Sequence, residues 1–203
     1  MTEPPRIAGV VLAAGRSERM GPANKLLAEI GGEAIVRRAA RAVVEAGVAP
    51  VVVVTGYEAE RVEAALAGLP VRFARNPRYR EGLASSLGVG LAAAREAAPA
   101  LAGVVIALGD MPWVKAAHIE ALIARFGAGV GCSICVPVFR GRWGNPVLWA
   151  ARFVPRMEAL EGDEGARALL REHPTEVCEV EVADAGVLRD VDTAAELEEA
   201  RGG

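Results

Sequence analysis

The sequence is poor in the residues that build disulfide frameworks, zinc sites and serine-hydrolase centres. It has three cysteines and two histidines among 203 residues, and it contains no G-x-S-x-G stretch. An odd number of cysteines in a chain of this length argues against a disulfide framework. Cys132 and Cys135 have the C-x-x-C spacing. Because residues three apart on a strand face opposite sides, we expect buried thiols here rather than a metal or redox pair.

Lysine is also scarce, and no basic stripe is present. Only Lys25 and Lys115 are lysines among 23 basic residues, and the net charge is −3. Binding to long nucleic acid needs many cations facing the phosphates, so this class of partner is not expected. A single nucleotide needs only a few cations, and the compact ammonium group of a lysine is not reproduced by arginine.

Long apolar runs are missing as well. The run at residues 7–14 is too short to span a membrane, and no segment resembles a signal peptide. We therefore expect a cytoplasmic protein without a membrane partner. Hydrophobic residues make up 52% of the chain, which suits the packed core of one domain covering residues 1–203.

Apolar, β-branched runs alternate with amphipathic stretches. Strands are predicted at residues 7–14, 50–56, 71–74, 103–110 and 176–182, and helices at 34–47, 58–68, 85–98, 118–126, 162–173 and 190–200. This alternation indicates a mostly parallel sheet with helices on both faces, a three-layer α/β/α, Rossmann-like fold. After Gly127, "CSICVPVF" and "PVLWA" flank "RGRWGN", which predicts an antiparallel hairpin or an excursion over the sheet edge.

A loop with two glycines, "LAAGRSERMG" at residues 12–21, follows the first predicted strand. Ligands bind beyond the carboxyl ends of parallel strands, and glycines permit close approach of the backbone. The spacing fits neither G-x-x-x-x-G-K-[ST] nor G-x-G-x-x-G. Arg16, Arg19 and Lys25 bring three cations to the loop, enough to hold a triphosphate. A plain turn with solvated arginines explains the local pattern equally well.

The stretch "ALGDMP" places Asp110 at the end of a buried strand. A carboxylate there is costly to desolvate unless it is paired or binds a metal. Mg²⁺ prefers one or two carboxylates together with phosphate oxygens. An aspartate that caps the following turn is the alternative. With the glycine loop beside it, we favour a metal ligand.

The stretch "LAAGRSERMGPANK" is similar to the opening motif of the molybdenum-cofactor guanylyl- and cytidylyltransferases and the nucleotidyltransferases that resemble them. Five more segments follow in the order expected for that family: "NPRYREGLASSL", "LGDMP", "GRWGNPVLW", "GDEGARALL" and "DVDTAAEL". Six segments in order are a specific match over most of the chain. The resemblance implies a nucleotidyltransferase fold and the transfer of a nucleoside monophosphate to a phosphorylated acceptor, with release of pyrophosphate.

The resemblance also implies roles for individual residues. Arg19, Lys25 and Asp110 would be the catalytic residues, and Asp110 would hold Mg²⁺, or Mn²⁺ in its place, together with Asp192; Asp190 is the substitute for Asp192. The residues expected to bind the nucleotide are Leu12, Ala13, Ala14, Gly15, Arg19, Lys25, Asn76, Gly82, Ser85 and Ser86. One of the two serines is also the expected cap of the helix at residues 85–98.

The stretch "GRWGNPVLW" joins Asn145 to two tryptophans, a combination that suits a flat heterocycle such as a pterin. A hairpin with core aromatic residues is the alternative, and for Trp149 we favour the core. The resemblance places the acceptor near this segment and near "GDEGAR", so Asn145 and Asp163 are the candidate acceptor-binding residues. Asp163 is also the expected cap of the helix at residues 162–173.

Within the resembling family, L-A-A-G accompanies cytidine transfer and L-A-G-G accompanies guanosine transfer. Ala14 stands at the deciding position. The resemblance therefore implies CTP as the nucleotide and molybdopterin as the acceptor, with a molybdenum hydroxylase as a further candidate partner. The alternatives are guanylyl transfer, another NTP and small phosphorylated acceptor, or a non-catalytic carrier of the finished cofactor. Arg19, Lys25 and Asp110 together favour catalysis, because a carrier need not bind a metal–triphosphate complex.

Overall fold

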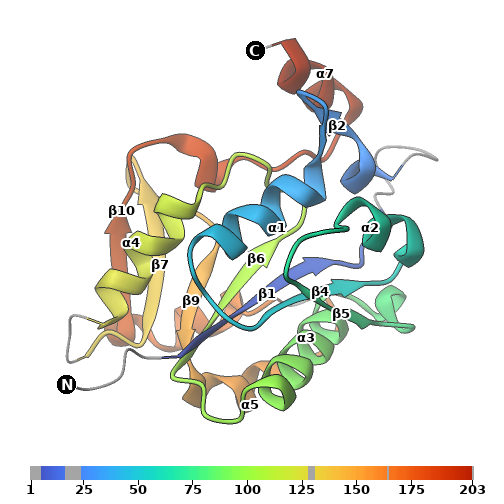
Figure 1. Ribbon diagram of the computed structural model, residues 1–203. Coiled ribbons are helices and arrows are strands. Elements are labelled where there is room, and N and C mark those ends of the chain that lie inside the picture. The colour runs from blue at the N-terminus through green and yellow to red at the C-terminus, as the bar shows by residue number, and fades with distance from the viewer. Residues whose placement is uncertain (1–5, 17–23, 128–130, 164, 203) are drawn as a thin grey trace.

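The computed structural model describes residues 6–16, 24–127, 131–163 and 165–202 (Figure 1). An eight-stranded sheet has the order β10-β7-β9-β6-β1-β4-β5, with β8 paired to β7, and β2 and β3 form a separate pair. The strands are β1 (Ile7–Ala13), β2 (Glu29–Ile30), β3 (Glu33–Ala34), β4 (Val51–Thr55), β5 (Arg72–Arg75), β6 (Gly103–Leu108), β7 (Ile134–Phe139), β8 (Arg142–Trp143), β9 (Val147–Ala150) and β10 (Val177–Glu181). The helices are α1 (Ile35–Glu45), α2 (Ala59–Ala65), α3 (Leu83–Ala97), α4 (Ala116–Gly127), α5 (Val154–Glu158), α6 (Arg167–Glu172) and α7 (Ala194–Gly202).

The predicted fold class is confirmed. Strands β5, β4, β1 and β6 are parallel, and helices cover both faces of the sheet (Figure 1). The predicted antiparallel segment begins as the β7–β8 hairpin. The chain then returns as β9, which lies inside the sheet, antiparallel to both β6 and β7. The excursion therefore widens the sheet instead of crossing its edge.

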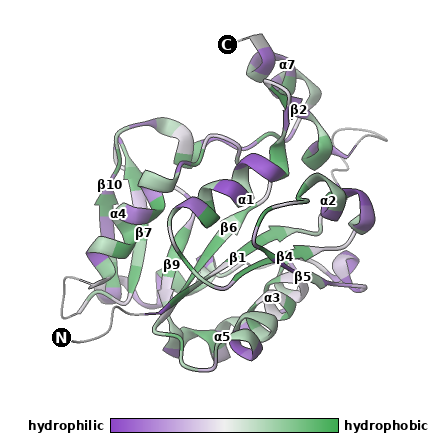
Figure 2. Cartoon of the chain, in the orientation of Figure 1, coloured by the Kyte–Doolittle hydropathy of each residue, from purple (hydrophilic) through white to green (hydrophobic). Residues whose placement is uncertain are grey.

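Alternate residues of the central strands supply two separate hydrophobic cores. Val11 packs on the side of α1, α2 and α4, whereas its neighbour Val10 packs on the side of α3, α5 and α6. Both valines are fully buried. Because successive side chains of a strand point to opposite faces, an apolar residue at every position is what a doubly covered sheet requires. The hydrophobic colour of the central strands in Figure 2 follows from this.

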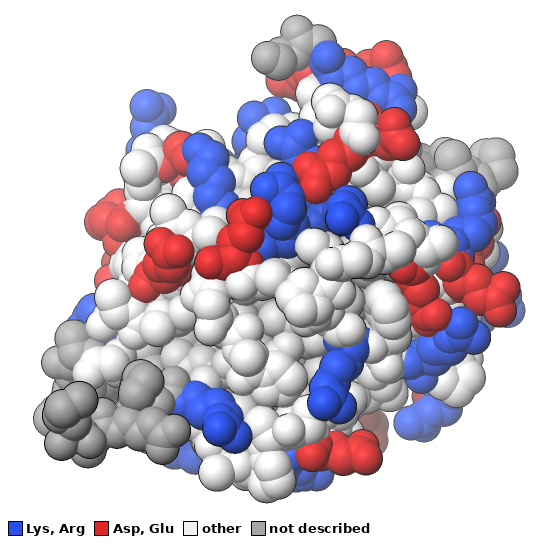
Figure 3. All heavy atoms as spheres, viewed as in Figure 1, with Lys and Arg blue, Asp and Glu red and all other residues white. Residues whose placement is uncertain are grey.

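The surface mixes charges of both signs. On the face drawn in Figure 3, basic and acidic side chains lie beside one another rather than in separate blocks. Arg41, for example, is 3.0 Å from Glu33 and 3.1 Å from Glu45. Among the described residues, no helix has the length and apolar character needed to cross a membrane.

The predicted helix ends are partly correct. Gly47 has φ +76° and donates its N–H to the carbonyl of Val44 just beyond α1, as expected for a C-terminal cap. Thr193 and Glu196 form the predicted capping box, with reciprocal hydrogen bonds of 2.8 and 3.2 Å. The predicted serine cap is wrong, because α3 begins earlier, after Gly82.

The predicted aspartate cap is wrong as well. The last helix before β10, α6, starts only at Arg167, and its N-cap residue, Ala166, makes no side-chain hydrogen bond. Asp163 lies three residues before that cap position. A turn at residues 162–163 precedes the helix, so the helical spacing of "GDEGARALL" begins later than the sequence indicates.

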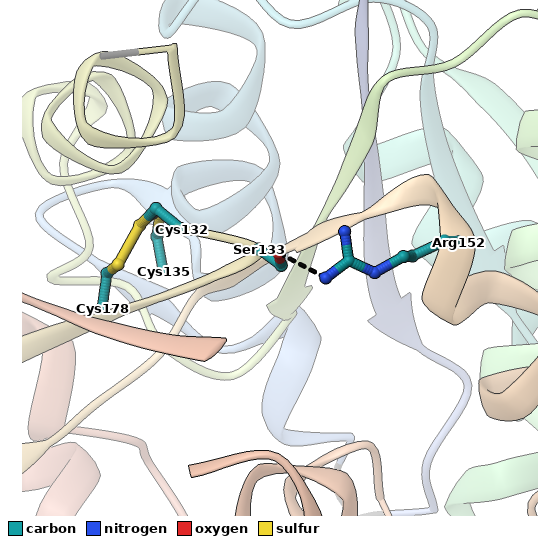
Figure 4. The surroundings of a disulfide bond; sticks show 5 residues. All are labelled: Cys132, Ser133, Cys135, Arg152 and Cys178. Carbon is teal, nitrogen blue, oxygen red and sulfur yellow. Dashed lines mark hydrogen bonds between the residues drawn. A yellow bond between two sulfur atoms is a disulfide. The ribbon is translucent and has the colours of Figure 1, made fainter. Parts of the chain in front are cut away.

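The expectation of buried thiols at Cys132 and Cys135 is wrong for Cys132. Cys132 and Cys178 form a disulfide (Figure 4). Cys132 precedes β7 rather than lying on it, so the alternation of a strand does not separate it from Cys135, and their sulfur atoms are 3.4 Å apart. Cys178 lies close to Cys132 because β10 pairs with β7. Cys135 is the free cysteine, and burial raises the pKa of its thiol to about 11, which keeps it protonated near neutral pH.

Candidate active site

The ends of two parallel strands create the site. Leu12 of β1 lies opposite Leu108 of β6, and Gly109 donates its N–H to the carbonyl of Leu12 over 2.9 Å. Asp110 follows at once, so its carboxylate lies beside the beginning of the glycine loop. The carboxyl edge of the sheet therefore holds the polar groups, as the strand pattern predicts.

A short turn carries Lys25 into the same place. The turn η2 (Lys25–Leu27) is capped by Asn24, whose side chain accepts from the N–H of Leu26 over 3.1 Å. From there Lys25 Nζ lies 2.7 Å from Asp110 Oδ2 and 2.6 Å from Asp192 Oδ1. The lysine side chain is 13% exposed, so this is a largely buried ion-pair cluster.

The chain end supplies the second carboxylate. Val191 donates its N–H to the carbonyl of Asp110 over 3.0 Å, which ties the segment before α7 to the end of β6. Asp192 N–H donates to Glu196 Oε2 at 2.8 Å, so the capping box also fixes this residue. Asp190 lies on the same side, and one carboxylate oxygen from each of Asp110, Asp190 and Asp192 falls within 4.8 Å of the others.

The cluster shifts the pKa of two of its members. Burial acts to lower the pKa of Lys25, but the charge of Asp110 and hydrogen bonds to Asp110 and Asp192 outweigh it and raise that pKa above its ordinary value. Burial raises the pKa of Asp190, and the nearby carboxylates of Asp192 and Asp110 add to the effect. Lys25 therefore remains an ammonium ion at neutral pH.

The acidic group fits a hard divalent cation. All three candidate ligands are carboxylates, the donor type that Mg²⁺ and Mn²⁺ prefer. Asp110 Oδ1 is buried and has no hydrogen-bond partner in the described part of the chain. A buried carboxylate oxygen without a partner is costly, and a bound cation would remove that cost.

A cavity of about 610 Å³ opens next to the cluster. Its wall contains many of the residues predicted to bind the nucleotide: Leu12, Ala13, Ala14, Gly15, Lys25, Gly82 and Ser86. Asp110 lines it too, and so does Asp163, which the sequence assigned to the acceptor. The volume and the mixed wall suit a nucleotide-sized ligand.

Two predicted nucleotide-binding residues lie behind this wall. Asn76 is buried, and its Nδ2 donates to Ser85 Oγ at 2.9 Å and to Ser86 Oγ at 3.0 Å. Its Oδ1 accepts from the N–H of Arg78 over 2.9 Å. In this arrangement Asn76 and Ser85 position Ser86, which reaches the cavity. Arg19, a predicted catalytic residue, lies outside the described residues.

Further residues of the wall were not predicted, among them Tyr79, Arg80 and Leu83. Arg16, one of the three cations expected to hold a triphosphate, lines the cavity too. The guanidinium of Arg80 lies 5.7 Å from the centroid of the Tyr79 ring. The basic stretch "NPRYREG" before a helix is the sequence signal that points to a polyanion here.

The wall includes a close backbone contact between two segments far apart in sequence. Gly82 has φ +106°, and a Cβ built on it would lie 2.3 Å from the carbonyl oxygen of Gly162. The N–H of Ala84 donates to the same oxygen over 3.1 Å. The two backbone segments lie too close for a side chain to fit between them, so glycine is required at position 82. This contact holds Asp163 against the 610 Å³ cavity.

A second cavity of about 320 Å³ adjoins the first and shares Leu12, Leu83 and Leu108 with it. Asn145 and Asp190 line this second cavity, which is otherwise mostly apolar. Trp149 also contributes to its wall, but its side chain is 1% exposed and belongs to the core, as expected. The two predicted acceptor residues are thus separated, with Asn145 in the second cavity and Asp163 in the first.

Comparison with known proteins agrees with this architecture. The model of the MobA-like NTP transferase domain matches residues 9–177. The chain belongs to the MobA-like NTP transferase family. It is 30% identical to nicotine blue oxidoreductase of Paenarthrobacter nicotinovorans and 31% identical to the purine catabolism protein PucB of Bacillus subtilis (strain 168), with 97% of each chain covered in both comparisons.

Solved structures support the same assignment for this MobA-like nucleotidyltransferase. A nucleotidyl transferase from Methanothermobacter thermautotroptrophicus superposes with a TM-score of 0.82 at 26% identity, covering 97% of this chain and 96% of the other. Rv0371C of Mycobacterium tuberculosis H37Rv, solved in complex with manganese, superposes with a TM-score of 0.79 at 27% identity, covering 99% and 100%.

Proposed function

We propose that this nucleotidyltransferase moves CMP from CTP to molybdopterin and releases pyrophosphate, acting as one domain in the cytoplasm. The observation that carries the proposal is the convergence of Lys25, Asp110 and Asp192 beside a nucleotide-sized cavity. The one cation and the two carboxylates of that group come from three distant segments, and the distances of 2.6 and 2.7 Å show a built cluster rather than a chance surface pair.

In this proposal the nucleotide lies across the wall formed by residues 12–16, with its base near Ala13 and Ala14. Lys25 and Arg80 face its phosphates, and Arg19 is proposed to join them. A divalent cation held by Asp110 and Asp192, or by Asp190 in place of Asp192, would neutralise charge on the phosphates when bound. Lys25 would stabilise the charge that develops on the leaving pyrophosphate. The chain thus contributes mainly by orienting and neutralising its substrate.

The second cavity is the proposed acceptor site. Its apolar wall suits the faces of a flat heterocycle, and the amide of Asn145 offers both a donor and an acceptor at its edge. The two cavities share Leu12, Leu83 and Leu108, which supports a proposal in which the two ligands bind next to each other. A phosphate oxygen of the acceptor could then attack the α-phosphorus in line. No strong base is needed, because that phosphate is already ionised at neutral pH.

A pyrophosphate-release assay with purified molybdopterin and each of the four ribonucleoside triphosphates tests the proposal. We expect release with Mg²⁺ or Mn²⁺, strongest for CTP. Release with GTP instead would show that the protein transfers GMP. Release only with another acceptor would exclude molybdopterin as the acceptor. Retention of bound cofactor without release under every condition would identify a carrier and overturn the proposed catalysis.

A further inference from the structure

Lys25 lies at the point where the carboxylates of the proposed metal site converge. Its Nζ is 2.7 Å from Asp110 Oδ2 and 2.6 Å from Asp192 Oδ1, and Asp190 offers a third carboxylate nearby. One internal cation is therefore already bound by the oxygens that a divalent ion would use. A polyphosphate-binding lysine has no need to contact both of these carboxylates, so the contact calls for an explanation.

We propose that Lys25 is a built-in substitute for the metal ion: it neutralises the carboxylates while the ion is absent, and it turns into the nucleotide cavity when the ion arrives. This inference rests on the metal site of the proposed function. It assigns the lysine two alternative positions, and it makes metal binding a competition with a side chain of the protein itself.

The geometry favours replacement over simultaneous binding. Mg²⁺ needs ligand oxygens at about 2.0–2.1 Å. Asp110 Oδ2 and Asp192 Oδ1 now converge on Nζ instead. A divalent ion that took these oxygens would occupy the position of the ammonium group, and the two cations would repel each other at that distance. Asp110 Oδ1, buried and without a hydrogen-bond partner in the described chain, is then available as a further ligand atom.

The cavity offers the side chain of Lys25 a second position. Lys25 lines the 610 Å³ cavity as well as the carboxylate cluster, and its four-carbon stem can reach either side. The backbone need not move, because the Asn24 cap fixes the turn and Leu26 is buried beneath it. Only the side chain changes position, from two carboxylates to the phosphate oxygens of a ligand in the cavity.

The exchange couples the two ligands. A metal ion that arrives alone must displace the ammonium group from its two carboxylates, so its affinity is reduced. A polyphosphate in the cavity gives the displaced ammonium a new partner and restores that affinity. By linkage, the metal must then strengthen polyphosphate binding by the same factor.

The decisive experiment measures Mn²⁺ binding by electron paramagnetic resonance, with no nucleotide or acceptor present. We expect Lys25→Met to bind Mn²⁺ at least about tenfold more tightly than the unchanged protein, because the competing charge is gone. Lys115→Met is the matched control, since Lys115 pairs with Asp184, which is not one of the three clustered carboxylates, and the Mn²⁺ affinity of this variant should stay as it was. Equal or weaker binding by Lys25→Met overturns the proposal, because the lysine would then only orient the carboxylates.

A second measurement needs no substitution at this site. The chain has two lysines, so labelling lysine with ¹⁵N at Nζ gives two side-chain signals, assigned with Lys115→Met. We expect the Lys25 signal to shift as Mg²⁺ saturates the protein and the Lys115 signal to remain. A Lys25 signal that does not move at saturation refutes the exchange. Neither measurement depends on turnover, so failure of the proposed function would appear separately, as absence of pyrophosphate release.

Discussion

The two lysines of this chain form ion pairs of the same length in very different surroundings. Lys25 Nζ lies 2.6–2.7 Å from two carboxylates, and its side chain is 13% exposed. Lys115 Nζ lies 2.6 Å from Asp184 Oδ2, but its side chain is 64% exposed. Water screens the exposed pair of Lys115 but hardly reaches the pairs of Lys25, so ion pairs of equal length differ in interaction energy.

This difference shows that electrostatic energy is concentrated around Lys25 rather than in the exposed ion pairs. The surroundings of Lys25 combine segments separated by 85 and 167 residues, whereas exposed pairs of long side chains contribute little. Apart from Lys115, the other basic residues of the chain are arginines, such as Arg41 of α1, which pairs with Glu33 and Glu45. A lysine inside the site is consistent with a task that needs a compact, movable charge.

The largest expected effect concerns turnover. Lys25→Ala should lower the rate of nucleotidyl transfer about 10²–10³-fold, because it removes a preorganised cation from the phosphates. Lys115→Ala should leave the rate within about threefold, since its exposed pair is worth little. Initial rates of pyrophosphate release measure both. A similar loss in the two variants would show that burial does not distinguish the lysines.

A smaller effect is expected on stability. Lys25→Met leaves the carboxylates of Asp110 and Asp192 without their shared ammonium and should lower the free energy of unfolding by about 1–3 kcal/mol. Lys115→Met should lower it by about 0–1 kcal/mol. Urea titrations followed by circular dichroism provide the comparison. If Lys25→Met were as stable as the unchanged protein, the cluster would be neutral for folding and important only for ligands.

The two regions should also respond differently to pH. Since the pKa of Lys25 is raised, its contribution is complete below pH 10.5 and disappears as the pH rises through the higher folded value. The difference in unfolding free energy between the unchanged protein and Lys25→Met should therefore be constant from pH 6 to 9. Chemical denaturation at several pH values tests this, and a difference that vanishes near pH 7 would contradict the raised pKa.

The smallest effect concerns His118, beside Lys115. Burial lowers the pKa of His118, and the charge of Asp184 opposes this only partly. The unfolded chain takes up a proton near pH 6.5, but the folded protein resists it, so stability is lost as the pH falls below 6.5. His118→Asn should reduce that dependence. An unchanged slope between pH 6.5 and 5 would place the acid sensitivity elsewhere.

Much of the fold is predictable because it is local. Continuous valine and isoleucine runs predict β1, β4 and β6 to within about two residues of their ends, and the Thr193–Glu196 capping box is readable from its spacing. The position of β9 is not predictable in this way, because its insertion between β6 and β7 depends on contacts across the whole sheet. The Cys132–Cys178 bond spans 46 residues and follows from the pairing of β10 with β7, so no local pattern reveals it.

The site is predictable in its composition more than in its geometry. The glycine-loop motif and the aspartates indicate which residues gather, and Lys25, Asp110 and Asp192 do meet. The sequence directs Lys25 toward phosphate, whereas the structure turns it toward the carboxylates. Asp163 was expected beside Asn145, yet the Gly82–Gly162 contact holds it against the other cavity. Such a contact between distant backbones has no signature in either segment.

That backbone contact has a consequence for how the family can vary. Because Gly82 and Gly162 meet without any side chain between them, the spacing of the two walls is set by main-chain atoms alone. Leu83 and Asp163, which directly follow the two glycines, line the cavities. Substitutions at these two neighbours would therefore change the shape of the cavities while the main-chain spacing of the two walls stays fixed.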